Sequence, residues 1–85
     1  MPYTYILECA DKTYYTGWTT NLSERLRSHN CGSGARYTRG RLPVRLVYAE
    51  YQPTASEACK REAVIKRLSR AAKESLIAGV SSENR

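Results

Sequence analysis

Long apolar runs are missing from this chain of 85 residues, as are phenylalanine, internal repeats and low-complexity stretches. The longest early apolar run covers residues 5–7 and is stopped by Glu8. A membrane-spanning helix needs about 20 apolar residues, and the apolar part of a signal peptide needs about 7–15, so we identify neither. We expect a soluble, cytoplasmic protein with one ordered domain over residues 1–80 and a frayed tail over residues 81–85.

Cysteine is scarce and follows no spacing pattern. The chain has three cysteines, Cys9, Cys31 and Cys59. An odd number without a Cys-x-x-Cys pair argues against both a disulfide framework and a cysteine zinc site. We expect three reduced thiols that act as small apolar side chains.

Acidic residues are absent from residues 25–45, a segment that carries the entire net charge of +6. The remaining residues hold eight basic and eight acidic side chains, which balance. Because a guanidinium group binds phosphate in a bidentate manner, the segment indicates a polyanionic partner, of which nucleic acid is the commonest. A basic surface that only aids solubility is the alternative. The six basic residues are Arg25, Arg27, Arg36, Arg39, Arg41 and Arg45.

Alternation of apolar and polar residues predicts three strands, over residues 2–7, 13–18 and 43–51. A turn at residues 11–12 joins the first two strands, so they are expected to form a hairpin.

Capping boxes predict where two helices begin, at Asn21 with Glu24 and at Thr54 with Glu57. The first helix is expected to end near Gly32, and the second to cover residues 55–70. A short final helix should end near Gly79, and residues 30–42 are expected to form a mobile basic loop. The order β-β-α-β-α-α predicts an α+β domain with a small antiparallel sheet and helices packed on it.

Side chains that suit an anionic substrate gather between residues 15 and 29. Arg25 and His29 are four residues apart, so they share one face of the first predicted helix. The leucines of that helix should hold it against the sheet and leave Arg25 and His29 at the rim. Tyr15 on the adjacent strand can point to the same rim, and Gly17 leaves room for a close approach. The alternative is a core tyrosine, a strand-end glycine and two surface polar residues.

Glu62 lies at the edge of the apolar arc of the second long helix. A carboxylate that faces a sheet needs a partner or a metal ion, because burying it alone is costly. The simpler alternative is an ion pair with Lys66, one helical turn further on.

Taken together, these residues resemble the GIY-YIG nuclease domain over roughly residues 3–77. Tyr15-Thr16-Gly17 stands where the family has Tyr-Ile-Gly, and an arginine follows the tyrosine by ten residues. Tyr3-Thr4-Tyr5 stands in place of Gly-Ile-Tyr and keeps only the tyrosine. The stretches GARYTRGRLPVRLVY and EAVIK are typical of small stand-alone bacterial members.

The resemblance implies a three-stranded antiparallel sheet flanked by helices and a metal-dependent endonuclease that hydrolyses phosphodiester bonds in DNA. Tyr15 would be the general base or would position the attacking water, and Tyr5 would support it by hydrogen bonding. Arg25 would bind the scissile phosphate, and His29 would contact the phosphate or assist proton transfer. Glu62 would be the only protein ligand of one divalent cation, Mg²⁺ or Mn²⁺.

Two other functions stay open at this point. A nucleic-acid-binding module with a degenerate site would use the same basic segment without cutting, and a protein-interaction domain would carry that segment by chance. RNA also stays open as a substrate. Many members have an asparagine some dozen residues after the glutamate, and Lys73 lies in that region here.

Overall fold

The computed structural model describes the backbone of residues 1–83 and the side chains of residues 1–79. Three strands form one antiparallel sheet in the order β2-β1-β3. They are β1 (Tyr3–Glu8), β2 (Tyr14–Thr19) and β3 (Arg45–Tyr51). The first strand is therefore central, and β2 and β3 are the edge strands.

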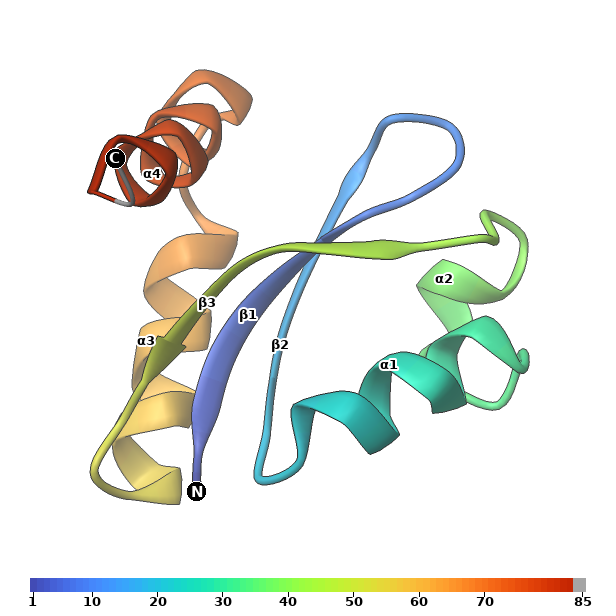
Figure 1. Ribbon diagram of the computed structural model, residues 1–85, viewed down its shortest axis with the longest axis horizontal. Helices are drawn as coiled ribbons and strands as arrows, with labels where there is room; N and C mark the ends of the chain where they lie inside the picture. Colours follow the sequence, from blue (N-terminus) through green and yellow to red (C-terminus); the bar gives the residue numbers. More distant parts are fainter. Residues whose placement is uncertain (84–85) are drawn as a thin grey trace.

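Four helices are described in these residues, two on each face of the sheet (Figure 1). The helices α1 (Leu22–Asn30) and α2 (Arg36–Arg39) lie on one face. The helices α3 (Ala55–Lys66) and α4 (Arg70–Glu83) lie on the other. The predicted α+β fold, its three-stranded antiparallel sheet and the element order are thus confirmed. In the described part of the chain, no helix combines the length and apolar character needed to cross a membrane.

The two faces of the sheet bury separate apolar clusters because side chains alternate along β1. Tyr5 and Leu7 pack toward α1, with Val44 and the leucines of α1. Ile6 packs toward α3 and α4, with Ile65 and Tyr48. All four residues from position 4 to position 7 are buried, because helices cover both faces of this strand.

Local hydrogen bonds confirm the predicted helix starts. Asn21 Oδ1 accepts from the Glu24 backbone N–H at 3.1 Å, and Thr54 Oγ1 accepts from the Glu57 N–H at 3.1 Å. Each such cap is worth about 1 kcal/mol. After α1 the chain turns at Gly32, whose φ of 82° favours glycine.

Three predicted elements were wrong in extent. The short final helix expected to end near Gly79 is α4, which covers 14 residues from Arg70 to Glu83. The helix expected over residues 55–70 ends at Lys66, and α4 begins at Arg70, because the Ser69 hydroxyl accepts from the Ala72 N–H at 3.1 Å and caps a new helix. The apolar side of α3 is also narrower than its sequence suggests, since Val64 is 48% exposed. The stretch predicted as a loop over residues 30–42 contains the one-turn helix α2.

The predicted frayed tail over residues 81–85 stays a prediction. The backbone of α4 continues to Glu83, while residues 84 and 85 lie outside the described residues.

Candidate active site

A buried chain of hydrogen bonds links the sheet to α1 and α2. Tyr5 Oη lies 3.1 Å from His29 Nε2, and His29 Nδ1 lies 2.9 Å from Thr38 Oγ1. The Thr38 hydroxyl donates its one proton to the Ala35 carbonyl at 2.9 Å, so it accepts from His29 Nδ1–H. The neutral imidazole then accepts from the Tyr5 hydroxyl at Nε2. Tyr5, His29 and Thr38 are each at most 2% exposed.

His29 therefore lies in the interior, and its predicted place at the rim is wrong. The reason is α2, which covers the end of α1 and supplies Thr38 to the imidazole. Gly34 is part of the same enclosure, since a Cβ there would meet His29 Nδ1 at 2.4 Å. Both ring nitrogens of His29 are hydrogen-bonded to protein, to Tyr5 and to Thr38, so neither is free to bind a phosphate.

Two glycines and the tyrosines determine how tightly this region packs. Gly17 pairs with Tyr5 across the sheet, and a Cβ at Gly17 would lie 2.6 Å from Tyr5 Oη. Gly17 was expected to leave room for backbone or a ligand, whereas the group that lies close to it in the structure is the Tyr5 phenol. Gly34 likewise lies close to the imidazole of His29.

Tyr15 lies beside the hydrogen-bonded series Tyr5–His29–Thr38, on the same face of the sheet. Its ring centroid is 5.4 Å from that of His29 in an edge-on arrangement and 5.9 Å from that of Tyr37 in a stacked one. Arg41 covers Tyr37 in turn, with its guanidinium carbon 4.0 Å from the ring centroid. Such aromatic contacts restrict ring motion, so Tyr15 is held between His29 and Tyr37.

Arg25 acts electrostatically on the buried chain. Burial raises the pKa of Tyr5, and the Arg25 guanidinium opposes that rise. Burial lowers the pKa of His29, and the charge of Arg25 lowers it further. Among the described residues no group hydrogen-bonds the buried Nε of Arg25. Arg25 is therefore a cation beside an uncharged tyrosine and an uncharged histidine, an arrangement that favours binding of an anion.

Glu62 lies on α3, on the opposite face of the sheet from α1, and its charge adds to the rise in the pKa of Tyr5. Its side chain is 17% exposed and pairs with Lys66, Oε2 to Nζ, at 2.9 Å. The ion-pair alternative for Glu62 is thus observed. Within residues 1–79 no cluster of three His, Cys, Asp or Glu side chains could hold a metal ion. One carboxylate can still serve a hard cation that keeps most of its waters.

A cleft of about 340 Å³ opens beside the edge strand β2. Its lining comes from four elements, β2, α2, α3 and α4. The lining residues are Tyr14, Tyr15, Thr16, Tyr37, Lys66 and Lys73. Lys73, noted in the sequence for its place after Glu62, therefore lines the same cleft as Tyr15. Arg25 lines a separate depression of about 190 Å³ at the start of α1.

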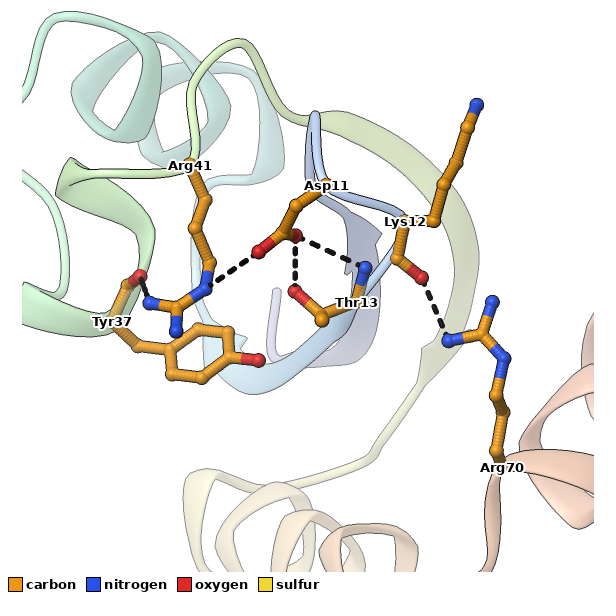
Figure 2. A network of polar contacts seen from close by, with 6 residues as sticks. All are labelled: Asp11, Lys12, Thr13, Tyr37, Arg41 and Arg70. Carbon is orange, nitrogen blue, oxygen red and sulfur yellow. Dashed lines mark hydrogen bonds and ion pairs between the residues drawn. The ribbon is translucent and has the colours of Figure 1, made fainter.

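The turn between β1 and β2 is bonded to the region of α2 on one side and to α4 on the other (Figure 2). On one side, Arg41 Nε pairs with Asp11 Oδ2 at 3.0 Å, and Arg41 Nη1 donates to the Tyr37 carbonyl at 2.7 Å. On the other side, Arg70 Nη1 donates to the Lys12 carbonyl at 2.7 Å. The hairpin turn thereby fixes α2 and α4 relative to β2.

Apart from Arg25, described above, the arginines of residues 25–45 divide into two groups. Arg41 is bound in the network just described, and Arg45 pairs with Glu8 at 2.8 Å. Neither is a free cation, so their predicted role in binding nucleic acid loses support. Arg27, Arg36 and Arg39 are exposed, and no acidic partner for them occurs among residues 1–79.

The cysteines agree with the prediction of reduced thiols. All three are free, but the expected role as a small apolar side chain in the core holds only for Cys9, because Cys31 and Cys59 are exposed.

Comparison with known proteins identifies the family. The profile of the GIY-YIG catalytic domain matches residues 1–75. The chain belongs to the GIY-YIG nuclease family. A UPF0213 protein of Clostridium perfringens is 53% identical over 81 residues, covering 95% of this chain and 87% of that protein. A UPF0213 protein of Natronomonas pharaonis is 55% identical over 76 residues, which is 89% of each chain.

Solved structures agree with this family assignment. The solution structure of a UPF0213 protein from Bacillus halodurans matches with a TM-score of 0.58 and 48% identity, over 92% of this chain and 84% of that one. A protein from E. faecalis matches with a TM-score of 0.61 and 42% identity, over 93% and 84%. The small stand-alone type of GIY-YIG protein expected from the sequence is confirmed.

Within this GIY-YIG domain, sequence reasoning missed three residues that shape the site. Thr38 fixes the imidazole, Gly34 makes room for it, and Tyr37 stacks on Tyr15. All three fall in the stretch that was predicted as a loop. They also fall in the stretch GARYTRGRLPVRLVY that carries part of the family resemblance, but neither that match nor the lack of large apolar side chains indicates which residues contact His29 and Tyr15.

Proposed function

We propose that this protein is a divalent-metal-dependent endonuclease that hydrolyses phosphodiester bonds in DNA. Membership of a nuclease family supports hydrolysis of nucleic acid. The observation that carries the proposal is the buried chain from Thr38 through His29 to Tyr5, directly beside Tyr15 and next to a basic cleft. A buried series of polar groups is costly unless every member has a hydrogen-bond partner. Here the series holds the phenols of Tyr5 and Tyr15 in place.

In this proposal Tyr15 orients the attacking water and takes or passes on its proton. Tyr5 and His29 are positioning residues, because their hydrogen bond holds the Tyr5 phenol against Gly17 and keeps the edge of the imidazole on Tyr15. Arg25 stabilises the charge that grows on the scissile phosphate. Its Nε is buried and lacks a partner among the described residues, so this donor would meet a phosphate oxygen once the side chain turns outward.

Glu62 is the residue that would hold a single Mg²⁺ or Mn²⁺. Its carboxylate is mostly buried, and the ion pair with Lys66 engages Oε2. A bound divalent cation would supply Lewis-acid stabilisation of the phosphate. Glu62 would provide one hard oxygen ligand. Its helix, α3, is held rigidly because Ala58 and Ile65 pack into the core.

A binding module that does not cut is the second proposal, and one observation favours it. Lys66 occupies the Glu62 carboxylate at 2.9 Å, so the protein neutralises its own candidate metal ligand. Such a protein would still hold nucleic acid through its basic cleft and the exposed Arg27, Arg36 and Arg39.

The experiment that separates these proposals is cleavage of plasmid, linear, single-stranded and branched DNA, and of RNA, with Mg²⁺, Mn²⁺ or EDTA. Metal-dependent cutting of DNA supports the endonuclease. In that case Tyr15→Phe should lower the rate at least about 100-fold, the usual size of acid–base assistance, while folding like the wild type. Wild-type rates in Tyr15→Phe would show that the phenol has no part in the reaction. Binding without cutting on every substrate would favour the binding module.

A further inference from the structure

The cleft beside β2 has the chemistry of an anion site separate from Arg25. Lys66 and Lys73 enter it from α3 and α4, and Tyr15 and Thr16 line it from the strand. Lys73 is half-buried and has no acidic partner among residues 1–79. Lys66 shares its charge with Glu62 at 2.9 Å. The cleft therefore contains one unneutralised ammonium group and a second that faces a single carboxylate.

Thr16 is a second, independent sign that a ligand is missing. It is 3% exposed, and its Oγ1 has no hydrogen-bond partner among the described residues. A buried hydroxyl without a partner is unfavourable, and such groups are rare in folded proteins. Rotation of the Thr16 side chain about χ1 would bring Oγ1 toward the cleft that this residue lines, where a bound polar group would supply the missing partner.

The position of the cleft along β2 indicates which phosphate it would take. Thr16 lines this cleft, whereas Thr19 and Arg25 line the depression at the start of α1. Three residues of strand separate Thr16 from Thr19, which corresponds to about 10 Å. Phosphates follow one another at about 3.4 Å along the axis of one DNA strand. The spacing along β2 thus leaves room for a second phosphate in the cleft, besides the one on which Tyr15 and Arg25 are proposed to act.

We propose that the cleft is a subsite for a backbone phosphate that flanks the phosphate at Arg25, with Lys73 as its principal cation and Lys66 and Thr16 as further donors. The subsite rests on the proposed function in one respect, since it takes a nucleic-acid strand as the ligand. A strand lying along β2 would then contact the cleft, pass Tyr15 and reach Arg25. The edge position of β2 leaves this path open.

The test is binding in EDTA, where no cutting interferes. A fluorescein-labelled single-stranded DNA and its duplex are titrated with the full chain at several salt concentrations, and the anisotropy gives the slope of log K against log salt. Lys73→Gln should weaken binding and reduce the slope by about 0.7 on the single strand and about 0.9 on the duplex, the values for one lost phosphate contact. Lys66 is left intact, because its substitution would also unpair Glu62.

The matched control is Lys60→Gln, which removes the same charge from an exposed lysine of α3 that pairs with Glu57 at 3.8 Å, outside the cleft. Its slope should equal that of the wild type. Equal slopes for Lys73→Gln and Lys60→Gln would overturn the subsite.

Thr16→Val provides a second test, because it should change thermal stability and DNA affinity in opposite directions. Removing an unpartnered buried hydroxyl should leave the melting temperature unchanged or higher, while DNA binding weakens by about 2- to 10-fold, the value of one hydrogen bond. Unchanged binding would contradict the role of Thr16. The outcomes also distinguish the two proposals. If the wild type never cuts but Lys73→Gln reduces the slope, the endonuclease is refuted and the subsite is kept. If the wild type cuts but Lys73→Gln leaves the slope unchanged, the endonuclease is kept and the subsite is refuted.

Discussion

Replacing Gly17 by alanine would put a methyl group into space that Tyr5 occupies. The added Cβ would lie 2.6 Å from Tyr5 Oη, 2.8 Å from Tyr5 Cζ and 3.2 Å from Tyr15 Cε2. The Tyr5 ring is 2% exposed and its hydroxyl is bonded to His29, so it has little room to move. Overpacking of this kind costs about 1–3 kcal/mol, and losing the hydrogen bond costs about 0.5–1.5 kcal/mol more.

Gly17→Ala should therefore lower the free energy of unfolding by about 2–4 kcal/mol, seen in urea titration, and lower Tm by at least about 10 °C. Gly40→Ala is the control, because its Cβ would meet no atom within 4 Å. Part of the cost should disappear when Tyr5→Phe removes the closest atom, which a double-mutant cycle measures. If Gly17→Ala is as stable as Gly40→Ala, the packing of Tyr5 against this glycine is not the reason for a glycine here.

Two further predictions concern charge. Because burial and Arg25 lower the pKa of His29, the unfolded chain binds a proton first, near pH 6.5. Thermal stability should thus be full above about pH 6.5 and fall as the pH is lowered, and His29→Gln should lack this loss; a wild type whose Tm is flat from pH 7 to 5 would contradict it. Replacing the exposed Arg36 and Arg39 with serine should flatten the salt dependence of DNA binding by about 0.9 per contact on duplex without changing Tm. Arg41→Ser should instead lower Tm, because Arg41 is tied to the hairpin turn; equal effects on Tm would refute that distinction.

The parts of the fold that depend on neighbouring residues could be predicted from the sequence. Strand alternation gave the three strands to within two residues, and the caps at Asn21 and Thr54 marked two helix starts. The break after Lys66 was missed because Ser69 caps α4 without a glutamate or glutamine three residues on, which is the usual signal.

The placement of side chains between distant elements could not be predicted in the same way. Tyr5 and His29 are 24 residues apart, and Asp11 and Arg41 are 30 apart. Whether His29 lies at the rim or inside depends on α2, a single turn too short to show helical periodicity. The charge of Arg41 likewise suggested a phosphate contact, whereas the fold uses it to position Tyr37.

The most direct test of the endonuclease is the pair of variants Glu62→Gln and Glu57→Gln, both on α3. Each is assayed for DNA binding without metal, for Mn²⁺ binding by calorimetry, and for cleavage with Mg²⁺ or Mn²⁺. Glu62→Gln keeps the shape of the side chain and removes the charge that a hard cation requires. We expect it to fold and bind DNA at least as tightly as the wild type, while its cleavage and Mn²⁺ binding collapse. Glu57 is exposed and pairs with Lys60 at 3.8 Å, so Glu57→Gln should behave like the wild type. Undiminished metal-dependent cutting by Glu62→Gln would contradict the account.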